Sequence, residues 1–259
     1  MFVDAHFHLG HAPSFHFFDT DVDRYVRWMD LRQIQYCLNI HSIGLVGGEL
    51  RRSMEENVSA FERSNGRILS YYLYDPLRGE ECLKIMDAYP DRSIFKAIKL
   101  HPSIHGVYAD DPRYEAVWEY ARDHSLPIMS HTWTISNYNP TQKYSYPPLF
   151  EKYISAYPSV NLICGHSGGR YDGMMQTVKL AQTYPNVYMD VSGDVYAYGL
   201  IRYLVEHAGA DRVLFGSDGF WIDARTQIGM ILGADIALED KEKILRTNAL
   251  HIFGLEGRE

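Results

Sequence analysis

Short apolar runs alternate with helix-like segments along the whole chain, and this alternation constrains the fold more than any other feature. The strand-like runs are residues 2–8, 36–40, 67–74, 94–100, 127–130, 160–164, 187–191 and 212–215. Strands that alternate with helices are typical of a parallel sheet covered by helices. We therefore predict an α/β fold, a (β/α)8 TIM barrel, with one domain over residues 1–259.

The segments between these runs have apolar residues at helical spacing. The expected helices cover residues 20–31, 51–63, 80–88, 112–123, 148–157, 170–183, 195–207, 224–232 and 239–245. A doubly wound open sheet is the alternative, but that fold usually has a glycine-rich phosphate turn after its first strand. Here the first strand is followed by His8-Leu9-Gly10-His11-Ala12-Pro13 instead.

Charge and composition argue against a nucleic acid or a membrane as the binding partner. The chain has 25 basic and 33 acidic residues and a formal charge of -8, without the clustered Lys and Arg of a nucleic-acid surface. No apolar run approaches the length of a membrane span, and a strand predicted from residue 2 leaves no room for a targeting peptide. The three cysteines lack metal or redox spacing and fit buried free thiols. We expect a cytoplasmic protein with a small-molecule substrate, and the sequence leaves a homodimer open.

The first predicted strand carries two histidines two positions apart. The side chains of Asp4, His6 and His8 leave the same face of this strand. Two imidazoles directed at one point suit a divalent transition metal such as zinc. A His-x-His triplet also arises often by chance, so this stretch alone is equally consistent with a strand that ends in a polar turn.

Polar side chains end six of the eight predicted strands, where a barrel places its catalytic groups. They are His8, His41, Lys99 with His101, His131, His166 and Asp218. One histidine at a strand end is usually an ordinary loop residue, but this explanation does not account for six such ends. Imidazoles from the first and fifth strands and a carboxylate from the eighth would leave a metal position open for water. Asp218 could accept that water's proton, and His166 could act on the substrate.

Several motifs make a family resemblance specific. They are VDAHFHLG (residues 3–10), KLHP (99–102), MSHT (129–132), CGHSGG (164–169), FGSDGF (215–220) and TNALHIFGL (247–255). In order and spacing these motifs resemble the amidohydrolase superfamily, and within it the amidohydrolase-2 branch of enzymes like aminocarboxymuconate-semialdehyde decarboxylase and its hydrolase relatives. The resemblance covers essentially the whole chain.

The resemblance implies a set of site residues. One zinc or similar divalent metal would be held by His6, His8, His131 and Asp218. His166 would be the catalytic general acid or base, together with Asp218. Binuclear members of the superfamily bridge two metals with a carbamylated lysine, so a second metal held by Lys99, His131 and His166 is the alternative. For this branch we favour Lys99 as a contact for a substrate carboxylate.

Two long polar and aromatic segments, residues 10–20 and 132–148, follow ligand-bearing strands. We expect both to overhang the mouth of the barrel, where they could stack on a planar substrate. Lys99, His101 and Arg170 are candidate substrate-binding residues, because a guanidinium or ammonium can hold a carboxylate. A surface loop rich in turn residues is an equally good explanation of any single residue there.

We expect a metal-dependent hydrolase that uses a metal-activated water on a small carboxylated substrate with an amide, lactone or related bond. The alternative is a metal-dependent decarboxylase of a carboxylated ring compound. Decarboxylases of this branch often have Glu at the first ligand position, so His6 favours hydrolysis. A catalytically silent metal-binding barrel is a third alternative, which the presence of both His166 and Asp218 disfavours.

Overall fold

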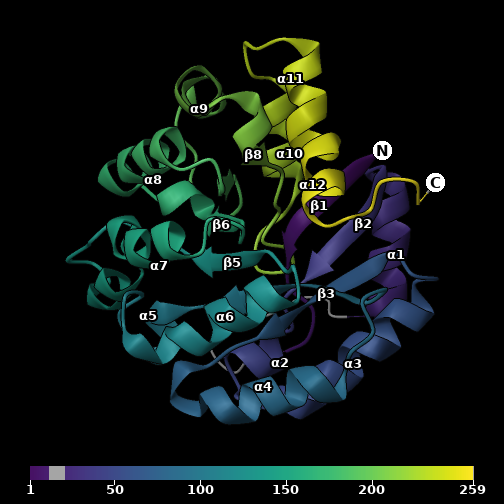
Figure 1. The fold of residues 1–259 in the computed structure, drawn as a ribbon. Coiled ribbons are helices and arrows are strands. Elements are labelled where there is room, and N and C mark those ends of the chain that lie inside the picture. Colours follow the sequence, from purple (N-terminus) through teal and green to yellow (C-terminus); the bar gives the residue numbers. More distant parts are fainter. Residues whose placement is uncertain (12–20, 259) are drawn as a thin grey trace.

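The computed structural model describes residues 1–11 and 21–258, and it confirms the predicted barrel. Its eight strands pair in parallel in the order of the chain (Figure 1). They are β1 (Phe2–Phe7), β2 (Ile34–Asn39), β3 (Ile68–Leu73), β4 (Phe95–Leu100), β5 (Ile128–His131), β6 (Leu162–Gly165), β7 (Val187–Asp190) and β8 (Val213–Leu214). The segment after β8 returns to β1, where Ala5 N donates to Phe215 O at 2.9 Å and Phe7 pairs with Gly219.

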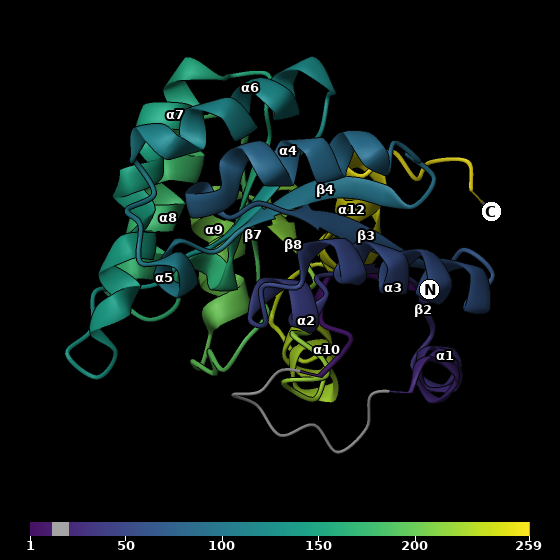
Figure 2. The ribbon, with the colours of Figure 1, turned by 90° about the horizontal axis from the view of Figure 1, so that it is seen from below.

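The helices surround the sheet (Figures 1 and 2). They are α1 (Val22–Leu31), α2 (Ser42–Leu45), α3 (Leu50–Arg63), α4 (Gly79–Ala88), α5 (Pro102–His105), α6 (Glu115–Asp123), α7 (Glu151–Ala156), α8 (Asp172–Thr183), α9 (Leu200–Ala208), α10 (Arg225–Leu232), α11 (Leu238–Glu242) and α12 (Asn248–Ile252). Amphipathic spacing predicted the long ones because each packs one apolar face on the sheet.

Four predicted helices differ by more than two residues from the observed ones. The helix expected over 239–245 is α-helical only to Glu242 and continues as a π-helix over Lys243–Thr247. The helix expected over 195–207 begins only at Leu200, because Gly199 precedes it with a left-handed φ of 76°. Those expected over 112–123 and 148–157 each begin with a 3-10 turn at a proline, Pro112–Tyr114 and Pro147–Phe150. A proline has no N–H to donate, so it suits the first turn of such a segment.

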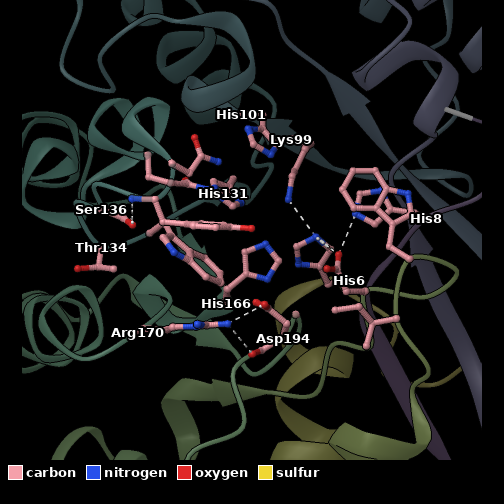
Figure 3. Close-up of a pocket in the computed structure, with 18 residues that line it drawn as sticks. His6, His8, Lys99, His101, His131, Thr134, Ser136, His166, Arg170 and Asp194 are labelled. Carbon is pink, nitrogen blue, oxygen red and sulfur yellow. Dashed lines mark hydrogen bonds and ion pairs between the residues drawn. The ribbon is translucent and has the colours of Figure 1, made fainter. Parts of the chain in front are cut away.

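The carboxyl ends of the strands surround one cavity of about 460 Å³ (Figure 3). The strand-end residues His8, Lys99, His131, His166 and Asp218 line it, as the barrel prediction requires. His41 lies two residues after β2, as the N-cap of α2, and is not part of the lining.

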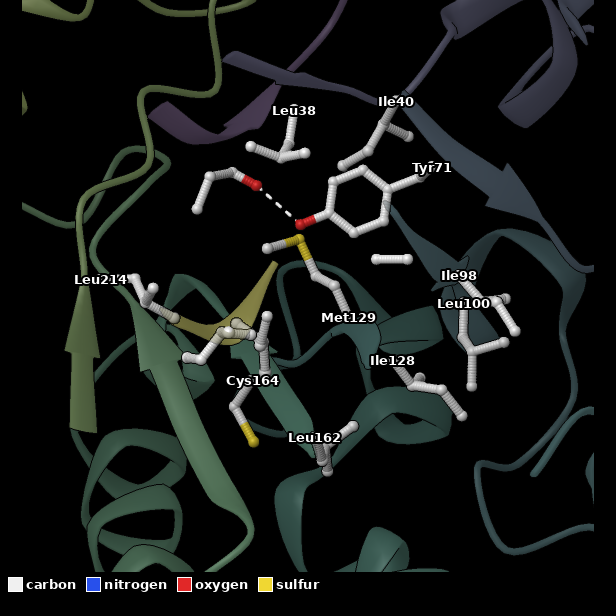
Figure 4. Packing of buried hydrophobic residues seen from close by; sticks show 14 of the residues in the cluster. Leu38, Ile40, Tyr71, Ile98, Leu100, Ile128, Met129, Leu162, Cys164 and Leu214 are labelled. Atoms are coloured by element: carbon white, nitrogen blue, oxygen red, sulfur yellow. Dashed lines mark hydrogen bonds between the residues drawn. The ribbon is translucent and has the colours of Figure 1, made fainter. Parts of the chain in front are cut away.

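The apolar core fills the barrel and the space between strands and helices (Figure 4). Tyr71 on β3 is fully buried, and its hydroxyl donates to Ala5 O on β1 at 2.8 Å, which satisfies the one polar group of that side chain. Cys37, Cys82 and Cys164 are buried free thiols, as predicted. Among the described residues, no helix is both long and apolar enough to span a bilayer.

Candidate metal centre and active site

His6 and His8 project from β1 with their Nδ1 atoms already engaged. His6 Nδ1 donates to the carboxylate of Asp190 at 2.9 Å, and His8 Nδ1 donates to the carbonyl oxygen of Ile40 at 2.9 Å. Burial lowers the pKa of both imidazoles, and the charge of Lys99 lowers that of His6 further, so both are neutral near pH 7. A neutral imidazole that donates from Nδ1 has a lone pair on Nε2. Both Nε2 atoms are therefore available as ligands.

Asp218 brings a third acceptor to the same point. Its Oδ1 lies 3.1 Å from His8 Nε2 and 3.5 Å from His6 Nε2, and the candidate ligand atoms of the three residues lie within 4.8 Å of one another. The backbone holds it there, because Asp218 has a φ of 61° and its N donates to His6 O at 2.7 Å. Burial raises the pKa of Asp218, but His8 and His166 lower it more, and the carboxylate is ionised.

His6 Nε2, His8 Nε2 and Asp218 Oδ1 cannot form hydrogen bonds with one another, because each carries a lone pair and none carries a hydrogen. Asp218 Oδ1 is buried and has no hydrogen bond of good geometry among the described residues. Two neutral imidazoles and one carboxylate are a donor set that divalent transition metals bind. The residues present therefore fit a divalent metal such as the sequence predicts, with His6, His8 and Asp218 as its candidate ligands.

Lys99 supplies a positive charge at the edge of this cluster. Its side chain is almost completely buried, and Nζ lies 3.1 Å from His6 Nε2 (Figure 3). Burial lowers the pKa of Lys99 to about 8, although Asp190 and Asp218 oppose that shift. The side chain points into the cavity, where its remaining N–H groups can reach a bound anion.

His131 lies in the cavity wall outside the cluster of three ligand atoms. Its ring stacks on His101 at 4.1 Å between centroids, with Trp133 parallel to it at 5.8 Å. His131 Nε2 interacts with Gln142 Oε1 at 2.8 Å, so this nitrogen is the donor. The structure thus brings together three of the four predicted ligands and places His131 in the same cavity with one nitrogen engaged by Gln142.

His166 follows β6 and lies between the two groups, with its ring centroid 4.9 Å from that of His6 and 4.9 Å from that of His131. Together with His6 and Asp190 it forms a second group of potential ligand atoms within 4.8 Å. However, Asp190 already accepts hydrogen bonds from His6 Nδ1, His166 N and Ser192 N. We therefore interpret Asp190 as the residue that orients these histidines.

The predicted substrate contacts have different environments. Lys99 and His101 are buried in the cavity, whereas Arg170 is 61% exposed and pairs with Asp194 at 2.7 Å at its mouth. Of the two predicted overhanging segments, 132–148 contributes Trp133, Thr134, Ser136, Tyr138, Asn139 and Gln142 to the cavity lining. Most of the other segment, residues 12–20, lies outside the described residues.

Three residues of this site were not predicted from the sequence. Asp190 is the last residue of β7, and Ser192 lies two residues after it. Trp221 stacks on His8 at 4.1 Å with an interplanar angle of 7°. The signal for the first two was the polar segment Asp190-Val191-Ser192-Gly193-Asp194 around the end of the seventh predicted strand. The predicted strand covers residues 187–191, so Asp190 lies inside it and not at its end.

Comparisons with known proteins agree with the barrel fold. The family model described as Amidohydrolase matches residues 3–255. Gamma-resorcylate decarboxylase from Rhizobium radiobacter is 26% identical over 191 residues, which are 59% of this chain and 58% of that protein. The matched part therefore spans less than two thirds of that relative's length.

Solved structures share the whole fold at low sequence identity. A 2,6-dihydroxybenzoate decarboxylase complexed with 2,6-dihydroxybenzoate superposes with a TM-score of 0.75 and 19% identity, covering 99% of each chain. A dihydroxybenzoic acid decarboxylase from a Polaromonas species, with bound manganese and the inhibitor 2-nitroresorcinol, gives a TM-score of 0.73 and 17% identity, with coverage of 98% of this chain and 97% of that one.

Proposed function

The chain belongs to the amidohydrolase family, and from that premise we propose that it is a metal-dependent decarboxylase of a small carboxylated aromatic compound. The sequence favoured hydrolysis, with decarboxylation as its alternative. The relatives support the alternative better, because gamma-resorcylate decarboxylase and 2,6-dihydroxybenzoate decarboxylase are among the similar proteins.

The observation that carries the proposal is the convergence of three lone pairs at the bottom of the cavity, on His6 Nε2, His8 Nε2 and Asp218 Oδ1. A divalent ion held there would supply a Lewis acid for the oxygens of an anionic substrate. His131 is the proposed fourth ligand. Zinc suits such a set, and the manganese in the Polaromonas relative makes manganese the other ion to test.

The remaining residues fit a flat, negatively charged substrate. Lys99 presents N–H groups to a carboxylate or phenolate oxygen, and such charge-assisted hydrogen bonds are the stronger kind. Trp133 and Trp221 give the cavity apolar surface that would cover an aromatic ring and exclude water from it. The cavity thus combines a cationic end with aromatic walls.

In the proposed reaction the bond between the ring and the carboxylate carbon breaks, CO2 leaves, and the electron pair of that bond stays with the ring. The ring carbon takes up a proton, so the products are CO2 and the unsubstituted ring position. His166 is the residue placed to deliver this proton, since its imidazole lines the cavity beside the ligand cluster. Solvent at the cavity mouth then returns a proton to the imidazole.

The same residues could instead serve hydrolysis, with Asp218 accepting the proton of an attacking water, and the histidine at position 6 favours that candidate. To separate the two, protein loaded with zinc or with manganese is incubated with 2,6-dihydroxybenzoate and related carboxylated phenols, and in parallel with lactones and amides. CO2 and the decarboxylated phenol are measured together. We expect equal amounts of both, lost in Asp218→Asn and kept in Asp123→Asn, because Asp123 is an exposed carboxylate paired with Arg122 and is not part of the cavity lining. Cleavage of lactones or amides with no CO2 from any carboxylated phenol would overturn the proposal.

A further inference from the structure

Ser192 connects the proposed metal ligand His6 with His166. This serine is fully buried just after β7, and its Oγ lies 3.0 Å from His6 Nδ1 and 2.9 Å from His166 Nδ1. A hydroxyl has one hydrogen and can donate to only one of these two nitrogens. The direction of this one hydrogen bond decides where the proton of His166 lies.

The hydroxyl cannot donate to His6. Asp190 Oδ2 lies 2.9 Å from His6 Nδ1, and an ionised carboxylate only accepts, so the hydrogen of that bond is on Nδ1. The same tautomer leaves a lone pair on His6 Nε2, which faces the ligand cluster and Lys99 Nζ at 3.1 Å. Ser192 Oγ can accept from His6 Nδ1, and its own hydrogen can then reach His166 Nδ1 at 2.9 Å. The carboxylate of Asp190 is a competing acceptor for this hydrogen, but among the described residues it makes no hydrogen bond of good geometry with Ser192 Oγ.

A neutral His166 that accepts at Nδ1 carries its proton on Nε2. This Nε2 has no hydrogen-bond partner among the described residues, and the imidazole lines the cavity (Figure 3). The nitrogen of His166 that faces the cavity, Nε2, can then donate a proton but cannot accept one.

The backbone next to Ser192 is shaped for this contact. Gly193 has a φ of +86°, and a Cβ at that position would lie 2.6 Å from His166 Nδ1. Only a glycine lets the chain pass so close to the imidazole that the preceding hydroxyl reaches its ring nitrogen. Ser192 and Gly193 therefore pack closely against the Nδ1 edge of the His166 ring.

We propose that Ser192 is a positioning residue that fixes the tautomer of His166, with the Nε2 proton facing the substrate. The inference rests on the proposed decarboxylation, in which the ring carbon needs a proton. It adds to that proposal by assigning His166 as the proton donor. It also couples that role to the metal, because an ion on His6 Nε2 keeps the hydrogen on His6 Nδ1.

The tautomer is measured by nitrogen NMR of zinc-loaded protein with ¹⁵N-labelled histidine, in which the His166→Asn spectrum assigns the His166 signals. The parent should show the proton on Nε2, and Ser192→Ala should show a shift toward the Nδ1–H tautomer with parental metal content. Its kcat should fall about 10-fold with little change in KM, since one hydrogen bond is lost. Ser192→Thr, which keeps the hydroxyl, should restore the parental tautomer.

Ser70→Ala is the matched control, because Ser70 is also fully buried on a barrel strand and its hydroxyl has no hydrogen-bond partner among the described residues. It should leave tautomer and kcat unchanged. A parent His166 with its proton on Nδ1, or a tautomer that does not change in Ser192→Ala, would overturn the inference while leaving decarboxylation intact. Absence of CO2 release from a parent with the expected tautomer would instead count against the proposed function.

Discussion

Asp190 Oδ2 accepts a hydrogen bond from His6 Nδ1 at 2.9 Å, and this contact joins residues 184 positions apart in the chain. Burial raises the pKa of Asp190, but His6, His166 and Ser192 together lower it more, so Asp190 stays ionised in a fully buried position. A carboxylate behind a ligating histidine fixes its tautomer and raises its basicity. We therefore expect the strength of the proposed metal site to depend on a residue that is not one of its proposed ligands.

Asp190→Asn should weaken metal binding by about 10- to 100-fold, because an amide carries no charge to support His6. Competition with a chelator of known affinity measures this constant. Asp194→Asn is the matched control, since Asp194 is an exposed carboxylate paired with Arg170, and it should keep the parental affinity. Equal affinities for the parent and Asp190→Asn would mean that Asp190 does not support the site.

His166→Asn should reduce turnover by about 10²- to 10⁴-fold, the usual effect of removing a general acid or base. Metal content should stay near that of the parent, because His6, His8 and Asp218 form a cluster without His166. Steady-state kinetics and elemental analysis of the same preparation check both points. Loss of metal in this variant would place His166 among the ligands and support the binuclear alternative.

Lys99→Met should raise KM for a carboxylated substrate by about 10- to 100-fold, since hydrogen bonds to charged groups contribute about 1.5–3 kcal/mol. The metal should be retained, because the variant removes a positive charge 3.1 Å from His6 Nε2. Measured KM and metal content separate this role from that of a carbamylated bridge. A halved metal content would show that Lys99 bridges two ions.

Asp4 gives the stability of the protein a dependence on pH. Burial raises its pKa to about 7 in spite of the hydrogen bonds from Ser217, and Oδ2 has no partner among the described residues. Its ordinary pKa is 3.8, so between about pH 4 and 7 the folded state binds the proton that the unfolded state has released. Stability from this group is therefore present at low pH and is lost as the pH rises toward 7.

The expected loss is on the order of 4 kcal/mol across this window, from a shift of about three pKa units. Asp4→Asn should remove it, because the amide does not ionise. Denaturant unfolding of parent and variant at pH 5 and pH 8 covers about two of these three units, so the measured difference should be about 3 kcal/mol. Contributions from the buried histidines cancel in this difference. If the parent protein does not lose stability relative to Asp4→Asn between pH 5 and pH 8, the raised pKa of Asp4 is contradicted.

The sequence predicted the barrel and most of the candidate metal ligands, because both depend on patterns between residues that are close together in the chain. His6 and His8 share a face of β1 by strand periodicity, and Asp218 follows β8, so barrel topology alone brings them to one mouth. Asp190 and Ser192 were missed because their roles exist only through contacts with His6 and His166, far away in the chain.

Other differences came from tertiary packing that no local pattern contains. Arg170 was predicted to bind the substrate, but nothing in its neighbourhood in the sequence shows that Asp194 lies beside it. The stacking of His131 on His101 and its contact with Gln142 likewise depend on how the segment after β5 folds over the mouth. These are the positions where mutagenesis is most informative.

The most direct test of the account is the position of the metal, located by anomalous scattering in crystals of zinc- or manganese-loaded protein. We predict one strong peak, within about 2.3 Å of His6 Nε2, His8 Nε2 and Asp218 Oδ1, with the Asp190 carboxylate still bound to His6 Nδ1. The position of the peak also shows whether His131 is the fourth ligand. His131 can bind the metal through Nε2 only if its ring moves away from Gln142. A peak among His6, His166 and Asp190, or two peaks bridged by a modified Lys99, would contradict the account.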